Sequence, residues 1–136
     1  MSERLRQRLD DLGRVLGRLD EALAIPLDNP LAVDGTLQRF EFTFELAWKA
    51  LKDALATEGI EARTPKAVLR AAFGVGWLED EAAWLDMLDD RNLSSHVYRE
   101  DLAAEIYERV SANAPRLREA HDVMVALIED LPDGRT

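Results

Sequence analysis

The sequence predicts an all-α fold, an up-and-down bundle of about five helices that forms one domain over residues 1–136. Leucine and alanine supply 40 of the 136 residues, whereas valine, isoleucine and threonine supply 17, so local preferences favour helix over sheet. Near the N-terminus, six leucines recur every three or four residues, as on a helix that packs along its length. The composition, 47% apolar and 32% charged, is typical of a globular chain.

The first helix is predicted from this leucine series, which runs from Leu5 to Leu23. Ser2 stands where a side chain can cap the helix start. Two prolines interrupt the pattern after Leu23, so a connection is expected over residues 25–33.

A second helix is predicted from Asp34 to Gly59, whose missing side chain suits the backbone turn after a helix end. One side of this helix is apolar throughout, and a second apolar group lies nearly opposite: Phe42, Leu46 and Ala50. Between them runs a polar strip: Gln38, Glu41, Glu45, Lys49 and Lys52. Two apolar faces require two partners, so the helix is expected to be central and its second face to pack in another core layer or a homodimer interface.

Three further helices are predicted: about Pro65–Phe73, about Asp80–Asp90, and a last one from about Glu100. Thr64 directly before a proline is a typical start of the third helix. Residues 91–99 lose the helical period and are expected to form a connection. Pro115 is expected to kink the last helix or to break it in two.

Charge and cysteine content exclude several classes of function. The chain has no cysteine, so disulfides, thiolate metal sites and cysteine nucleophiles are absent. The net charge of −10 argues against a broad nucleic-acid track, although residues 1–20 carry +1 and leave room for a local cationic site. Neither a signal peptide nor a membrane span is expected, which predicts a cytoplasmic protein.

Residues 91–98 are the candidate functional segment, because they place many hydrogen-bonding groups between two apolar helices. A guanidinium at Arg91 can bind a phosphate, and an imidazole at His96 can move protons near neutral pH. Together they suffice for metal-independent RNA cleavage. The spacing alone is weak evidence, since Arg91 could pair with an acid such as Asp89 while His96 caps a helix. His121 is expected at a surface or boundary position.

No cofactor and no metal site is expected. Glu41 and Glu45 are interpreted as a salt-bridged surface, because a metal site in a helical bundle needs Glu-x-x-His pairs on facing helices. A solvated face is the better interpretation of the acids on the fourth helix: Asp86, Asp89 and Asp90. Glycine-rich phosphate loops and nucleophile elbows are absent.

Three segments together closely resemble the nucleotidyltransferase substrate-binding proteins of the HEPN superfamily, relatives of the HepT toxins. They are RFEFTFELAWKALK at residues 39–52, TPK at residues 64–66 and WLDMLDDRNLSSHVY at residues 84–98. The resemblance covers about residues 35–110, more than half of the chain.

This resemblance implies a homodimeric helical bundle encoded beside a minimal nucleotidyltransferase such as MntA. The family's R-x4-H-x-Y motif, which faces the dimer cleft, corresponds here to Arg91, His96 and Tyr98. Asn92 follows the arginine, as in the ribonucleases of the superfamily, and Ser95 is a further candidate binding residue. In the toxin branch the tyrosine receives AMP from the partner enzyme, which implies Tyr98 as a modification site.

The sequence is therefore consistent with three functions. The first is a partner subunit that presents a nucleotide- or RNA-binding cleft to the nucleotidyltransferase, as part of a HepT/MntA-type toxin–antitoxin pair. The second is a metal-independent ribonuclease toxin that adenylylation of Tyr98 inactivates. The third is a structural helical partner whose polar segment only caps helices.

Overall fold

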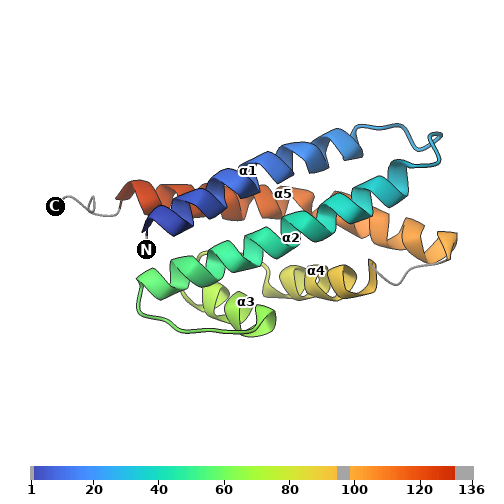
Figure 1. Cartoon of the computed structure of the whole chain (residues 1–136). Coiled ribbons are helices and arrows are strands. Elements are labelled where there is room, and N and C mark those ends of the chain that lie inside the picture. Colours follow the sequence, from blue (N-terminus) through green and yellow to red (C-terminus); the bar gives the residue numbers. More distant parts are fainter. Residues whose placement is uncertain (1, 95–98, 131–136) are drawn as a thin grey trace.

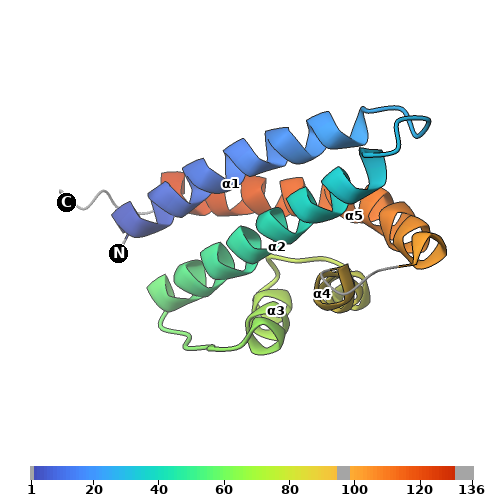
Figure 2. The same ribbon diagram turned by 45° about the vertical axis from the view of Figure 1, so that its right-hand side comes forward.

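The computed structural model describes residues 2–94 and 99–130, and within these ranges it contains five helices and no strand (Figure 1). The helices are α1 Ser2–Leu23, α2 Ala32–Thr57, α3 Pro65–Gly74, α4 Glu81–Ser94 and α5 Glu100–Asp130. The three long helices lie side by side, and the two short ones pack beneath α2 (Figures 1 and 2). The predicted all-α bundle of about five helices is confirmed.

The leucine series of α1 forms one side of the core. Five of its leucines are at most 4% exposed: Leu5, Leu9, Leu12, Leu16 and Leu19. Leu23 is half-buried at the helix end. The packed leucine seam confirms the first predicted helix and supplies much of the apolar area that stabilises the bundle.

α2 contacts each of the other four helices, which confirms its predicted central position. It starts at Ala32, two residues before the predicted Asp34, and the chain leaves it through Gly59 at φ +77°, a backbone conformation that favours glycine. The proposed second apolar face is narrower than expected. Phe42 is exposed, but Ala50 is fully buried within the chain, because α1 packs along that side of α2.

α3 begins as predicted, with the Thr64 hydroxyl accepting a hydrogen bond from the Ala67 amide at 3.2 Å. α4 extends to Ser94, so the predicted helix end at Asp90 is wrong. The last turn of α4 carries polar side chains that bind polar groups of α2, so the helix continues where the apolar period stops. A pattern of apolar residues detects only a helix face that enters the core.

Pro115 lies inside α5 and does not break the helix. In Figure 2 the first part of α5 runs in a different direction from the rest, in line with the expected kink. Buried residues on both sides of the proline hold the two parts on one core: Val110, Ala114, Leu117 and Ala120. No helix in the described part of the chain is long and apolar enough to cross a membrane.

Candidate functional site

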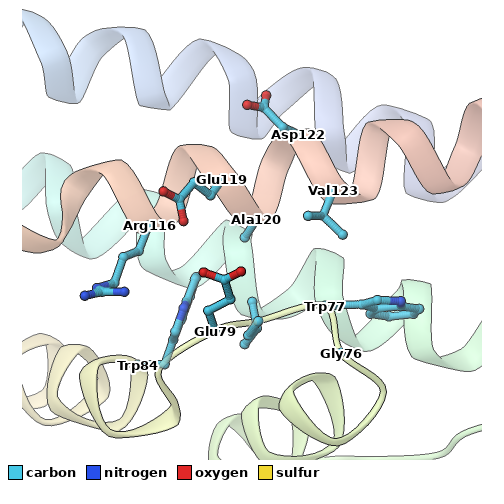
Figure 3. Close-up of a pocket in the computed structure, with 10 residues that line it drawn as sticks. Gly76, Trp77, Glu79, Trp84, Arg116, Glu119, Ala120, Asp122 and Val123 are labelled. Atoms are coloured by element: carbon cyan, nitrogen blue, oxygen red, sulfur yellow. The ribbon is translucent and has the colours of Figure 1, made fainter.

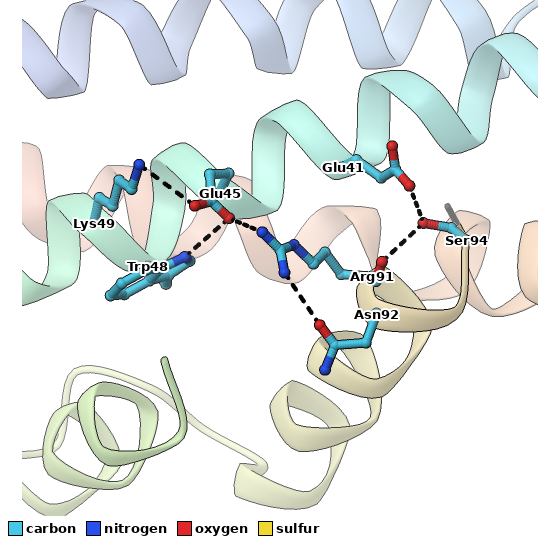
Figure 4. A network of polar contacts seen from close by, with 7 residues as sticks. All are labelled: Glu41, Glu45, Trp48, Lys49, Arg91, Asn92 and Ser94. Atoms are coloured by element: carbon cyan, nitrogen blue, oxygen red, sulfur yellow. Dashed lines mark hydrogen bonds and ion pairs between the residues drawn. The ribbon is translucent and has the colours of Figure 1, made fainter. Parts of the chain in front are cut away.

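A network of polar side chains joins the end of α4 to the polar strip of α2 (Figure 4). Its centre is an ion pair between the Arg91 guanidinium and the Glu45 carboxylate, two residues 46 positions apart in the sequence. The Arg91 side chain is 35% exposed and the Glu45 side chain 30%, so water still reaches both groups. Arg91 is therefore held in place without being sealed from a ligand.

Glu45 collects three donors. Besides Arg91, the Trp48 indole donates to its Oε2 atom at 3.2 Å, and the Lys49 ammonium lies 3.4 Å from its Oε1 atom. Burial alone would raise the pKa of Glu45, but the hydrogen bond from Trp48 and the charges of Arg91 and Lys49 together lower it below its ordinary value. Glu45 is thus held as a carboxylate.

A second contact between the two helices lies one turn nearer the C-terminus of α4 and one turn nearer the N-terminus of α2. The Ser94 hydroxyl donates to Glu41 Oε1 at 2.6 Å and lies 3.0 Å from the Arg91 carbonyl oxygen. On the exposed side, Arg91 donates from Nη1 to the Asn92 amide oxygen at 3.1 Å. These bonds fix the last turn of α4, which forms the first half of the candidate functional segment, residues 91–98.

The opposite side of α4 is anchored to α5 by Asp90. The Asp90 residue is 3% exposed, and its carboxylate accepts hydrogen bonds from Nε of Arg109 at 3.1 Å and from Nη2 at 2.9 Å. This hydrogen bonding and the negative charge of Asp90 raise the pKa of Arg109. α4 is therefore held from two sides, which sets the position and direction of its end.

The structure places the predicted site residues as follows. Arg91 and Asn92 lie next to each other on the last turn of α4. Ser95, His96 and Tyr98 lie outside the described residues, so their approach to Arg91 stays a prediction. The alternative partner for Arg91, Asp89, is not used, because the guanidinium reaches Glu45 on α2 instead.

Glu41 and Glu45 were expected to form a salt-bridged surface, and Glu45 is salt-bridged, but their role as partners of α4 was not predicted. The polar strip of α2 could have predicted this role, because its residues lie on one side of the helix, next to the side that is buried. His121 lies at a boundary, as predicted: its ring is half-buried and Nε2 is 3.1 Å from the Leu9 carbonyl oxygen. Trp84 is buried in the core, whereas Trp48 is half-buried and donates a hydrogen bond to Glu45.

A separate cavity of about 400 Å³ lies between the α3–α4 connection and α5 (Figure 3). Its lining mixes charged and apolar groups: Glu79, Arg116, Glu119 and Asp122 with Trp77, Trp84 and Val123. Arg116 is already paired with Asp80 at 3.2 Å. The cavity shares no lining residue with the Arg91 network. Over the described ranges, no group of three or more histidines and acids is arranged to hold a metal ion.

Comparison with known proteins gives consistent matches. A family model described as "Nucleotidyltransferase substrate binding protein like" matches residues 7–126. The probable ribonuclease HepT of Haemophilus influenzae is 35% identical over 83 residues, which are 57% of this chain and 57% of that protein. This chain thus matches little more than half the length of that relative.

Two solved structures share the fold. A crystal structure of a protein from Thermus thermophilus is 35% identical, with a TM-score of 0.72 over 86% of this chain and 98% of that chain. A Haemophilus influenzae structure, described as the fold of a substrate-binding domain of a nucleotidyltransferase, is 22% identical, with a TM-score of 0.66. That alignment covers 92% of this chain and 99% of the other.

Proposed function

Because the chain belongs to the nucleotidyltransferase substrate-binding protein-like family, we propose that it is the substrate-binding partner subunit of a separate, minimal nucleotidyltransferase. The observation that carries this proposal is the family match over residues 7–126, which includes the whole polar segment 91–98. The proposal places both proteins in the cytoplasm as a HepT/MntA-type toxin–antitoxin pair.

The proposed site is a cleft at a HEPN-type homodimer interface, built around Arg91, His96 and Tyr98 with Asn92 and Ser95 beside them. Support comes from Arg91, which the ion pair with Glu45 holds in one orientation while about a third of its side chain faces water. A phosphate can share or take over the guanidinium, because Arg binds phosphate oxygens through paired hydrogen bonds. The ligand class is therefore a nucleotide or an RNA.

Tyr98 is the proposed acceptor of AMP. Its phenol oxygen attacks the α-phosphate of ATP, pyrophosphate leaves, and the phenol proton is lost to water. The added phosphate then competes for Arg91, which blocks the cleft by charge and by size.

The test is incubation with the nucleotidyltransferase encoded by the adjacent reading frame, Mg²⁺ and ATP, followed by intact-mass measurement. We expect the two proteins to co-purify, and one or more AMP units on the wild type but none on Tyr98→Phe. Equal labelling of the Phe variant would refute Tyr98 as the acceptor. Absence of both complex and label would favour the purely structural helical role.

The second candidate is a metal-independent ribonuclease, favoured by the 35% identity to the probable ribonuclease HepT. In this mechanism His96 takes the proton of a ribose 2′-hydroxyl, the oxygen attacks the adjacent phosphorus to form a 2′,3′-cyclic phosphate, and the 5′-oxygen leaves with a proton from water. Arg91 stabilises the negative charge on the phosphorane.

If the chain is a ribonuclease, Arg91→Ala and His96→Ala should each abolish RNA cleavage and growth inhibition. The helical circular-dichroism signal should be kept in both variants, and EDTA should have no effect. Cleavage that requires Mg²⁺, or that survives His96→Ala, would contradict the ribonuclease candidate.

A further inference from the structure

α3 forms a basic island in an acidic chain. The whole sequence carries a net charge of −10, yet residues 62–78 contain three bases, Arg63, Lys66 and Arg70, and no acid. Exposed cations that cluster in this way create a local positive potential even when the molecule as a whole is negative.

The exposed side of α3 combines cations with an aromatic ring. Lys66, Arg70 and Phe73 follow at spacings of four and three residues, which places them on one side of the helix. All three are exposed, and Phe73 is 43% exposed. The residues that hold α3 in the core lie on a different side: Val68, Leu69 and Ala72. We call Lys66, Arg70 and Phe73 the α3 cationic face.

Among the described residues, the two cations of this face have no acidic partner. Arg63 is paired with Glu61 at 2.6 Å, but neither Lys66 nor Arg70 forms an ion pair with any residue that the structure describes. A comparable acid-free stretch on α5 behaves differently, because each of its three arginines is paired: Arg109 with Asp90, Arg116 with Asp80 and Arg118 with Asp20. The α3 cationic face thus presents two positive charges, from Lys66 and Arg70, beside the exposed ring of Phe73.

α3 is a neighbour of both helices that carry the Arg91 network. α3 packs against both α2 and α4, and the polar strip of α2 runs past both helices. Lys49 and Lys52 on this strip follow Glu45, the partner of Arg91, towards the C-terminus of α2, which leads into α3. Lys52 is exposed and forms no ion pair with a described residue. Lys49 and Arg91, in contrast, are both paired with Glu45.

We propose that the α3 cationic face binds single-stranded RNA, with phosphates at Lys66 and Arg70 and a base stacked on Phe73. The inference rests on the proposed function and selects RNA as its ligand, because phosphates at two cations one helical turn apart and a base on the neighbouring ring require a strand. Cations combined with an aromatic stacking surface are typical of single-strand binding. The acidic remainder of the chain repels RNA and confines the strand to this face.

The experiment measures fluorescence anisotropy of a labelled ten-nucleotide RNA, in a His96→Ala background so that cleavage cannot consume the probe. We expect Lys66→Glu/Arg70→Glu to weaken binding at least about tenfold and to reduce the slope of log K against log salt by about 1.4, for two lost phosphate contacts. Phe73→Ala should weaken binding about fivefold or more.

The matched control is Arg14→Glu/Arg18→Glu, which makes the same charge change at the same spacing on exposed positions of α1. This variant should weaken RNA binding no more than about threefold, from the change in net charge alone. Equal loss in both double variants, unchanged binding after the α3 reversal, or absence of RNA binding by the parent protein would each overturn the inference.

A second measurement separates this inference from the proposed function. The α3 double variant should still bind the nucleotidyltransferase and accept AMP as the wild type does. Loss of that complex together with RNA binding would assign α3 to partner docking and overturn the RNA inference. Absence of AMP transfer to the wild type would instead contradict the proposed function, whatever the RNA binding shows.

Discussion

Glu45 is the residue on which the hydrogen bonds and ion pairs of the candidate site converge. It binds Arg91 from the neighbouring helix α2, and Trp48 and Lys49 help to keep it ionised. The Glu45 carboxylate orients the Arg91 guanidinium. An incoming phosphate competes with this carboxylate for the guanidinium.

The lowered pKa of Glu45 predicts a pH-dependent contribution to stability. Because the pKa is lower in the folded chain, the contribution is full above the ordinary value of 4.5 and is lost as the pH falls through the folded value. Glu45→Gln should therefore lower the free energy of unfolding by up to about 1 kcal/mol at neutral pH and less in acid.

Urea denaturation of wild type and Glu45→Gln between about pH 7 and pH 3 checks this prediction, over the range in which carboxylates titrate. The two curves of stability against pH should converge at the acid end. Glu129→Gln, at an exposed position that forms no ion pair with a described residue, serves as the control and should follow the wild type. A difference in stability between wild type and Glu45→Gln that stays constant with pH would contradict the lowered pKa of Glu45.

At the scale of elements, α4 is the part whose position the site depends on. Polar bonds to α2 hold one side of its last turn, and the Asp90–Arg109 pair holds the other side to α5. The two members of this pair differ in environment, since the Asp90 side chain is 4% exposed and the Arg109 side chain 44%. Replacing Asp90 and replacing Arg109 should therefore lower the stability of the protein by different amounts.

We expect Arg109→Ala to destabilise the protein by about 3 kcal/mol, because it leaves a buried carboxylate without a partner. Asp90→Ala should cost less, about 1 to 2 kcal/mol, because water can hydrate the half-exposed guanidinium that stays behind. Thermal or urea denaturation of both variants measures which of them loses more stability. A larger effect for Asp90→Ala would show that Arg109, not Asp90, is the group that needs the pair.

At the scale of the whole molecule, the open apolar surface of α2 predicts a homodimer. Phe42 is 49% exposed and Leu46 half-buried, whereas Ala50, expected on the same face, is covered by α1. The remaining patch lies one residue from Glu41 and Glu45, on the helix that holds Arg91. A second copy that covers Phe42 and Leu46 would therefore approach the candidate site.

Leu46→Glu should convert a dimer into a monomer of 15.3 kDa, because a carboxylate in the interface loses its hydration without gaining a partner. Light scattering at micromolar concentration measures the change, with the exposed Phe73→Glu on α3 as a control that should leave the mass at twice that of the chain. A wild-type mass of 15.3 kDa would contradict both the dimer and the composite cleft.

The sequence by itself determined the helices and their buried sides. The leucine spacing of α1, the Thr64-Pro65 start of α3 and the glycine after α2 are local signals, because they depend on residues within one or two turns. The assignment of Arg91, His96 and Tyr98 to one site came from the family resemblance and not from their spacing, and it stays a prediction because His96 and Tyr98 lie outside the described residues.

Only the tertiary structure decided which groups meet. Arg91 pairs with Glu45, 46 residues earlier, and Asp90 with Arg109 on another helix, whereas a neighbouring acid was the partner considered from the sequence. The extension of α4 to Ser94 has the same origin, since its last turn is held by polar bonds to α2 and not by an apolar face. Periodicity shows which side of a helix is buried, but the packing of helices distant in sequence determines which polar groups lie within hydrogen-bonding distance.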